Sequence, residues 1–194
     1  IFMEFQIAQE YLGQGNHLVY LAPMWKEILD FDTKIKQEKS QIKHTLSGIG
    51  AVSNTGNNSD WCGSLFHTAN LYAYGRLSWN FELSSEHIAR EWALCTWGLD
   101  TFLYEIVMFI LMNSWEACVN YMTPLCLHHI MKYHHHYGPD PACEEGERED
   151  WKPKYYHRAD KTGLGFDRTR NGSGAVDQYS KPVADMFNDI ATCP

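Results

Sequence analysis

Histidines and cysteines gather in the second half of the chain, where they could in principle bind a metal. The residues concerned are His128, His129, His134, His135, His136, His157, Cys126 and Cys143. A zinc site holds up to four such ligands at about 2 Å, and their usual paired spacings are absent here. Adjacent residues in a run also point in different directions. We therefore expect hydrogen-bonded loop histidines and no metal or cofactor, and a zinc-binding domain is the weakest alternative.

Carboxylates on the first segment are the second candidates for chemistry. Residues 3–11 alternate between apolar and polar types, which predicts a strand with Glu4 and Glu10 on one face. Hydrolysis of a glycosidic bond needs two carboxyl groups flanking that bond. Six residues of strand separate this pair by about 20 Å, so they cannot act together. Either the face is a solvated edge, or Glu10 ends a barrel strand whose catalytic partner lies outside these residues.

Composition narrows the function classes. The chain has 194 residues, with 16 basic and 24 acidic side chains and a net charge of −8. Binding of nucleic acid or an anionic membrane needs clustered positive charge, which is absent. The apolar stretch 101–112 contains Glu105 and is too short to span a bilayer. The opening residues are expected to form a strand rather than a signal peptide. The six cysteines are widely spaced and leave the compartment open.

The periodicity of the remaining chain predicts mostly helices. Residues 18–30 are mostly apolar, with a helix expected after Pro23, and further helices are expected from 63 to 79 and from the N-cap Ser84 to Gly98. A further helix over 101–121 is apolar on most sides and is expected to be buried. Residues 47–60 are rich in Gly, Ser and Asn and predict a loop. Residues 128–171 lack any period and carry many aromatics, which favours a functional irregular region, and a last helix is expected over 174–189.

Several long strings resemble the glycoside hydrolase family 67 α-glucuronidases. They are MEFQIAQEYLG at 3–13, ANLYAYGRL at 69–77, YMTPL at 121–125 with His128 and His129, YYHRAD at 155–160 and GFDRT at 165–169. The likeness covers nearly the whole chain, in order. It implies a mainly α fold, in which residues 1–30 are the last strand and helix of a (β/α)8 catalytic barrel. Residues 31–194 would then be a truncated, all-helical C-terminal domain with a long irregular loop region.

The resemblance also implies an activity. The family removes 4-O-methyl-glucuronic acid, α-1,2-linked to the terminal xylose of xylooligosaccharides, with inversion. Glu10 matches the family glutamate that helps hold the attacking water, whereas the acid and the partner Asp lie outside this chain. Trp151 matches a tryptophan that reaches toward the sugar site, where its indole face would cover a sugar ring. A packing role for Trp151 stays equally open.

The resemblance further implies a homodimer formed through the helical domain, and inactivity of the chain on its own. Two positions depart from the family pattern: Ala142 stands where a Trp is frequent, and Cys126 replaces a usual Gly. The loop after Thr33 is also shorter. These departures bear on fine substrate specificity. A non-catalytic helical interaction module, in which carboxylates and aromatics serve only packing and dimer contact, is the alternative function.

Overall fold

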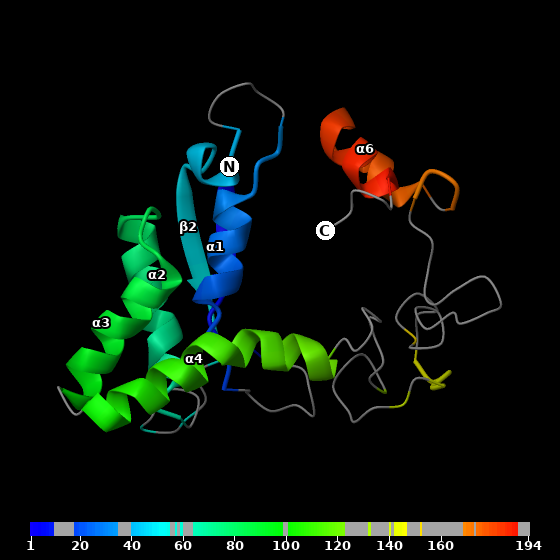
Figure 1. Ribbon diagram of the computed structural model, residues 1–194. Helices are drawn as coiled ribbons and strands as arrows, with labels where there is room; N and C mark the ends of the chain where they lie inside the picture. Colours follow the sequence, from blue (N-terminus) through cyan, green and yellow to red (C-terminus); the bar gives the residue numbers. More distant parts are fainter. Residues whose placement is uncertain are drawn as a thin grey trace. The chain divides into compact units, whose positions relative to one another are not determined.

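The computed structural model describes residues 1–9, 18–34, 40–54, 57, 59, 64–98, 101–122, 132, 140, 142–146, 152, 169–172 and 174–189. The chain divides into two compact units. The first comprises Ile1–Leu29 and Leu46–Leu125, and the second Asp30–Thr45 and Cys126–Pro194. Helices predominate in the described residues, in agreement with the mainly α fold expected from the sequence (Figure 1).

The first unit opens with a strand, a helix and a second strand. Strand β1 (Phe2–Gln6) is followed by helix α1 (Ala22–Asp30) and strand β2 (Gly48–Val52). The strands pair in parallel, from Phe2 opposite Gly48 to Gln6 opposite Val52. Parallel neighbours need a crossover connection, which here contains α1. Helix α1 is fixed to β1 by Trp25, whose ring stacks on Phe5 with centroids 4.7 Å apart.

The second strand corrects the sequence-based prediction of a loop over 47–60. Residues Gly48–Val52 are extended, so β1 is not the last strand of its sheet. One of the glycines that suggested a loop, Gly48, has a packing role, because a Cβ there would lie 2.9 Å from the Phe2 ring. Glycine in a strand often marks such a close approach.

Three helices complete the first unit: α2 (His67–Trp79), α3 (Ser85–Trp97) and α4 (Thr101–Met122). Helix α2 packs against α3 and β2, and α3 packs against α4 (Figure 1). The predicted ends of α3 are confirmed. Ser84 Oγ accepts a hydrogen bond from the His87 backbone N–H, and Gly98 ends the helix with a φ of 73°.

One shared core holds the helices and β1 together. Its members are Phe5, Val19, Tyr20, Leu21, Ala22, Trp25, Leu29, Ala69, Ala73, Leu77, Ile88, Ala89, Trp92, Ala93, Val107, Leu111 and Cys118. Helix α4 contributes only Val107, Leu111 and Cys118, spaced four and seven residues apart along one face. The expectation that α4 is buried is therefore wrong, since Phe102 and Phe109 are 75% and 71% exposed.

The second unit joins the α1–β2 connection to the end of the chain. It contains the 3-10 turns η1 (Ile42–His44) and η5 (Ala175–Gln178) and helix α6 (Lys181–Asn188). Ser180 Oγ donates to the Thr33 carbonyl at 2.9 Å. The single helix predicted over 174–189 is broken between η5 and α6. Pro182 explains the break, because proline is tolerated only in the first turn of a helix.

Candidate functional site

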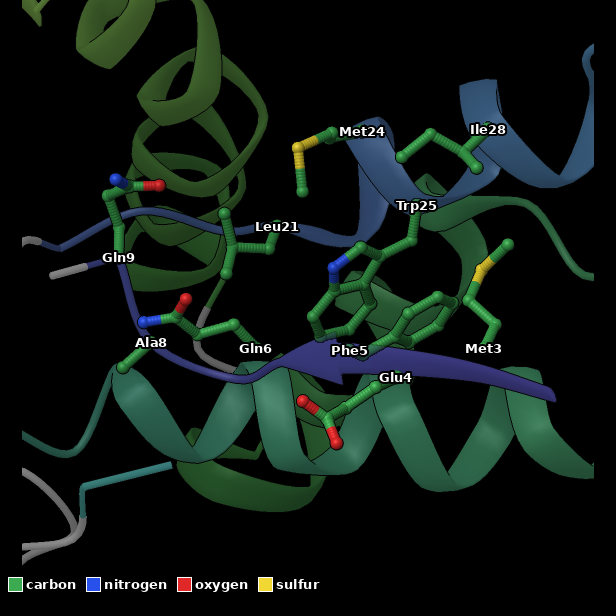
Figure 2. Close-up of a pocket in the computed structure, with 10 residues that line it drawn as sticks. All are labelled: Met3, Glu4, Phe5, Gln6, Ala8, Gln9, Leu21, Met24, Trp25 and Ile28. Carbon is green, nitrogen blue, oxygen red and sulfur yellow. The ribbon is translucent and has the colours of Figure 1, made fainter. Parts of the chain in front are cut away.

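A cavity of about 280 Å³ lies between β1 and α1 in the first unit. It is lined by Met3, Glu4, Phe5, Gln6, Ala8, Gln9, Leu21, Met24, Trp25 and Ile28 (Figure 2). The lining from α1 is apolar, and the polar side chains come from β1 and the residues after it. The sheet has two strands in the described part of the chain, and no residue of β2 lines this cavity.

The two faces of β1 differ as the alternation predicted. Phe5 and Ile7 are buried, whereas Glu4 is exposed. Figure 2 shows the Glu4 carboxylate on the opposite side of β1 from the Phe5 ring. Alternate side chains of a strand point to opposite faces, so Glu4 faces away from Phe5. Gln6 and Ala8, nearer the end of the strand, line the cavity together with residues of α1.

The two residues singled out for catalysis and substrate binding, Glu10 and Trp151, lie outside the described residues. The structure does describe the neighbour of Glu10 in the chain. Gln9 follows the carboxyl end of β1 and donates its side-chain amide to Met122 Sδ on α4, at 3.6 Å. Cys118 on the same helix contacts the same sulfur, with its Sγ at 3.2 Å. The residue before Glu10 is thus held against the end of α4.

Residues 18–21, which lead into α1, are held by polar side chains from two other helices. Asn70 of α2 accepts from the Leu21 N–H at 2.8 Å and donates to the Val19 carbonyl at 2.7 Å. Ser114 of α4 accepts from the Tyr20 N–H at 2.8 Å. The Tyr20 hydroxyl donates to the Ser85 carbonyl at 2.9 Å, and burial raises the pKa of Tyr20 well above its usual value.

Sequence reasoning did not single out Asn70 or Ser114 as functional. A signal was present in the helical spacing. Asn70 shares its face of α2 with Ala73 and Leu77, three and seven residues on, and all three are fully buried. Ser114 continues the buried face of α4 three residues after Leu111. A polar residue on a buried helical face requires a hydrogen-bond partner, and that partner is the 18–21 backbone.

An ion pair links α2 to α3 at the edge of this unit. The guanidinium of Arg76 binds Glu91 through two hydrogen bonds, from Nε at 2.7 Å and from Nη2 at 3.0 Å. Donation by Arg76 holds the pKa of Glu91 below its usual range. The Tyr72 hydroxyl also contacts Glu91, and burial raises the pKa of Tyr72. This cluster joins the two helices.

Comparison with known families decides the identity of the chain. Residues 1–61 match the glycosyl hydrolase family 67 middle domain, and residues 62–194 match the family 67 C-terminus. The chain belongs to glycoside hydrolase family 67. The two matched segments meet between residues 61 and 62, so the middle-domain segment contains β1, α1 and β2.

Curated fungal proteins resemble this family 67 chain over almost its full length. It is 41% identical to the probable alpha-glucuronidase A of Aspergillus fumigatus, over 99% of the chain. It is 39% identical to the alpha-glucuronidase A of Emericella nidulans and 37% identical to that of Aspergillus tubingensis, again over 99% of the chain. The chain spans about a quarter of the length of these relatives, 24% in each case.

Two further expectations concern metals and membranes. Among the described residues of this family 67 chain, no three His, Cys, Asp or Glu side chains lie close enough to hold a metal ion. The histidine cluster of the sequence lies outside those residues. Helix α4, over Phe102–Met122, is long and apolar enough to cross a membrane, which corrects the length argument made from residues 101–112. One such helix is weak evidence for a membrane protein, because helices of soluble proteins meet the same criterion.

Proposed function

We propose that this chain is part of an α-glucuronidase acting on fragments of glucuronoxylan. The enzyme hydrolyses the α-1,2 bond between (4-O-methyl)glucuronic acid and the terminal xylose of a xylooligosaccharide, with inversion. One observation carries the proposal: the family match runs from residue 1 to 194, and relatives named alpha-glucuronidase A align with 99% of the chain.

The proposed catalytic part is the end of a (β/α)8 barrel formed by β1, α1 and β2. Parallel pairing of the two strands across a helical connection supports this assignment. The catalytic domain was expected to end at residue 30, but the middle-domain match and β2 favour an end near residue 61. The edge of β1 that β2 does not pair with would then contact the preceding barrel units of the longer protein.

Glu10 is the proposed general base, which polarises the water that attacks the anomeric carbon. Its place in the chain supports the role, because it comes four residues after the end of β1 and chemistry in such barrels sits at the carboxyl ends of strands. An inverting enzyme separates its two carboxyl groups by about 6.5–9.5 Å to leave room for water. Glu4 is too far along the strand to be the partner, so the acid and the second water-holding group belong to the rest of the enzyme.

Trp151 is the proposed sugar-binding residue of the C-terminal domain. An indole face would cover the apolar C–H surface of a xylose or glucuronic acid ring. We also propose that the helical domain forms a homodimer. The exposed apolar side of α4, which includes Phe102, Ile106 and Phe109, supports a protein interface there.

The function is tested with Glu10→Gln in the full-length protein, which keeps the shape of the side chain and removes its basicity. Release of glucuronic acid from aldouronic oligosaccharides should fall by roughly 1,000-fold or more, with an unchanged melting curve. Glu86→Gln, on the exposed side of α3, is the control and should keep normal turnover.

Two outcomes would contradict this assignment. Near-normal turnover by Glu10→Gln would remove the base role, and loss of turnover in Glu4→Gln alone would transfer it to the other strand carboxylate. The isolated chain should release no glucuronic acid, because the remaining catalytic groups are missing. Two results together would favour the non-catalytic interaction module. They are a full-length protein without hydrolytic activity and an isolated chain that folds and forms a dimer.

A further inference from the structure

The connection that carries Glu10 is flanked on both sides by residues that the C-terminal helices hold. Gln9 immediately precedes Glu10, and Leu18–Leu21 follow it before α1 begins. Gln9 and Leu21 both line the β1–α1 cavity, and Figure 2 shows them near the same end of it. Both flanks therefore lie close together, against the part of the chain matched to the family C-terminus.

Helix α4 holds both flanks with one face. Its buried side carries Val107, Leu111, Ser114 and Cys118, and Met122 continues the same spacing. Met122 accepts the hydrogen bond from Gln9 before the connection, and Ser114 accepts the one from the Tyr20 N–H after it. The Ser114 hydroxyl is itself oriented, because it donates to the Leu111 carbonyl at 2.7 Å.

Helix α2 adds a second and stronger hold on the later flank. The Asn70 amide brackets Tyr20, accepting from the next N–H and donating to the preceding carbonyl. A side-chain amide has both a donor and an acceptor, so it can form the two backbone hydrogen bonds that a neighbouring strand would otherwise supply. Asn70 is fully buried, so water cannot replace it as a partner for these backbone groups.

We infer that Asn70 and Ser114 are positioning residues for the Glu10 connection, through which the C-terminal helices set the geometry of the catalytic end of the barrel. This inference rests on the proposed function of Glu10. It gives the helical segment a role in the reaction beyond substrate contact and dimer formation. Reactions held in a near-attack geometry lose rate steeply when a catalytic group is misplaced by about 1 Å.

The test uses the full-length protein with Ser114→Ala, which removes one acceptor, and Asn70→Asp, which keeps the shape but cannot donate to Val19. Both variants should lower kcat roughly 10- to 100-fold while KM stays within about twofold. Hydrogen exchange of the Tyr20 amide should become faster in Ser114→Ala, which removes its acceptor. In Asn70→Asp the carboxylate still accepts from the Leu21 N–H, so faster exchange at Tyr20 and Leu21 is expected there from the loss of the Val19 hydrogen bond that fixes the same backbone. Ser114→Thr keeps the hydroxyl and should restore kcat.

Thr68→Val is the matched control. Thr68 also lies on α2 and also makes a cross-helix hydrogen bond, a partly buried one, in which it accepts from Trp92 Nε1 of α3 at 3.1 Å rather than from the backbone of residues 18–21. Its kcat and the exchange of Tyr20 and Leu21 should match the wild type. If Asn70→Asp fails to fold, the milder Ser114→Ala decides the question.

The outcomes separate this inference from the proposed function. Hydrogen exchange reports on the hold of Asn70 and Ser114 on residues 18–21 and does not depend on activity. A wild-type protein that releases no glucuronic acid would overturn the proposed role of Glu10, whatever the exchange rates are. The inference itself is overturned if exchange at Tyr20 and Leu21 is unchanged in both variants. It is equally overturned if exchange rises but kcat stays at the wild-type value, or if Thr68→Val lowers kcat as much as Ser114→Ala.

Discussion

Asn70 is a polar residue on a helix face that otherwise carries alanine and leucine. Its full burial is stable because both ends of its amide are used, one on Leu21 and the other on Val19. An unpaired buried amide would cost about 1–3 kcal/mol, so the hydrogen bonds fix the 18–21 backbone as firmly as they fix Asn70. For single residues, the sequence therefore predicts which side chains are buried, but not which backbone groups form hydrogen bonds with them.

Trp151 is the residue for which two roles remain open, and a substitution separates them. In the full-length protein, Trp151→Ala should lower kcat/KM about tenfold, which corresponds to the roughly 1.4 kcal/mol expected for a ring stacked on a sugar. The free energy of unfolding should change little. Trp151→Phe keeps an aromatic face and should recover most of the loss.

The opposite result would assign Trp151 to packing. A buried tryptophan cut back to alanine loses about 3–5 kcal/mol of stability through the cavity it leaves. Such a loss, together with an unchanged kcat/KM of the folded protein, would remove the substrate role. Urea unfolding and initial rates on the same preparations measure both quantities.

At the scale of elements, the sequence predicted helices better than strands. Helix α3 has an N-cap at Ser84 and a left-handed glycine at Gly98, and both signals are local to the chain. Strand β2 has no such signal, because its first glycine, Gly48, is required by contact with Phe2 on a strand 46 residues earlier. The pairing of β1 with β2 is a tertiary property and overrides local propensity. The same limit applies to the break before α6, where Pro182 alone marks the start.

The joint between α2 and α3 gives a prediction that depends on pH. Arg76 holds the pKa of Glu91 below its ordinary value, so ionised Glu91 stabilises the folded state above the pKa of the unfolded chain. This contribution is lost as the pH falls through the lowered pKa. Glu91→Gln should therefore melt a few degrees lower than the wild type at pH 7. The two melting temperatures should converge between about pH 5 and pH 3.

Thermal melts across that pH range check the convergence. Glu86→Gln is the matched control, since Glu86 pairs with Arg90 on the exposed side of the same helix at 3.4 Å. Exposed pairs of this kind contribute little, so its melting temperature should follow the wild type at every pH. If the difference in melting temperature between Glu91→Gln and the wild type stays constant down to pH 3, the ion pair is not the cause of that difference.

At the scale of the whole molecule, the apolar composition of α4 does not tell which of its faces are buried. The helix is apolar enough to suggest burial on all sides, yet its inner face alone meets the core. Periodicity identifies a helix that is apolar all round but cannot say what covers each side. In the relatives, which are about four times as long as this chain, further protein is available to contact the corresponding helix. The proposed homodimer assigns a second copy to the outer face.

Phe109 is the residue with which to test that assignment, because it lies on the outer face near the middle of α4. In a two-fold interface each substitution occurs twice, so Phe109→Asp buries two carboxylates and should weaken the dimer about 100-fold or more. Sedimentation of the full-length variant should give the monomer mass under conditions where the wild type is dimeric. Trp79→Asp, at the exposed end of α2, is the control and should stay dimeric.

A wild type that is monomeric, or that sediments only with detergent or lipid, would contradict the assignment, because the outer face of α4 would then be covered by the rest of the chain or by a membrane.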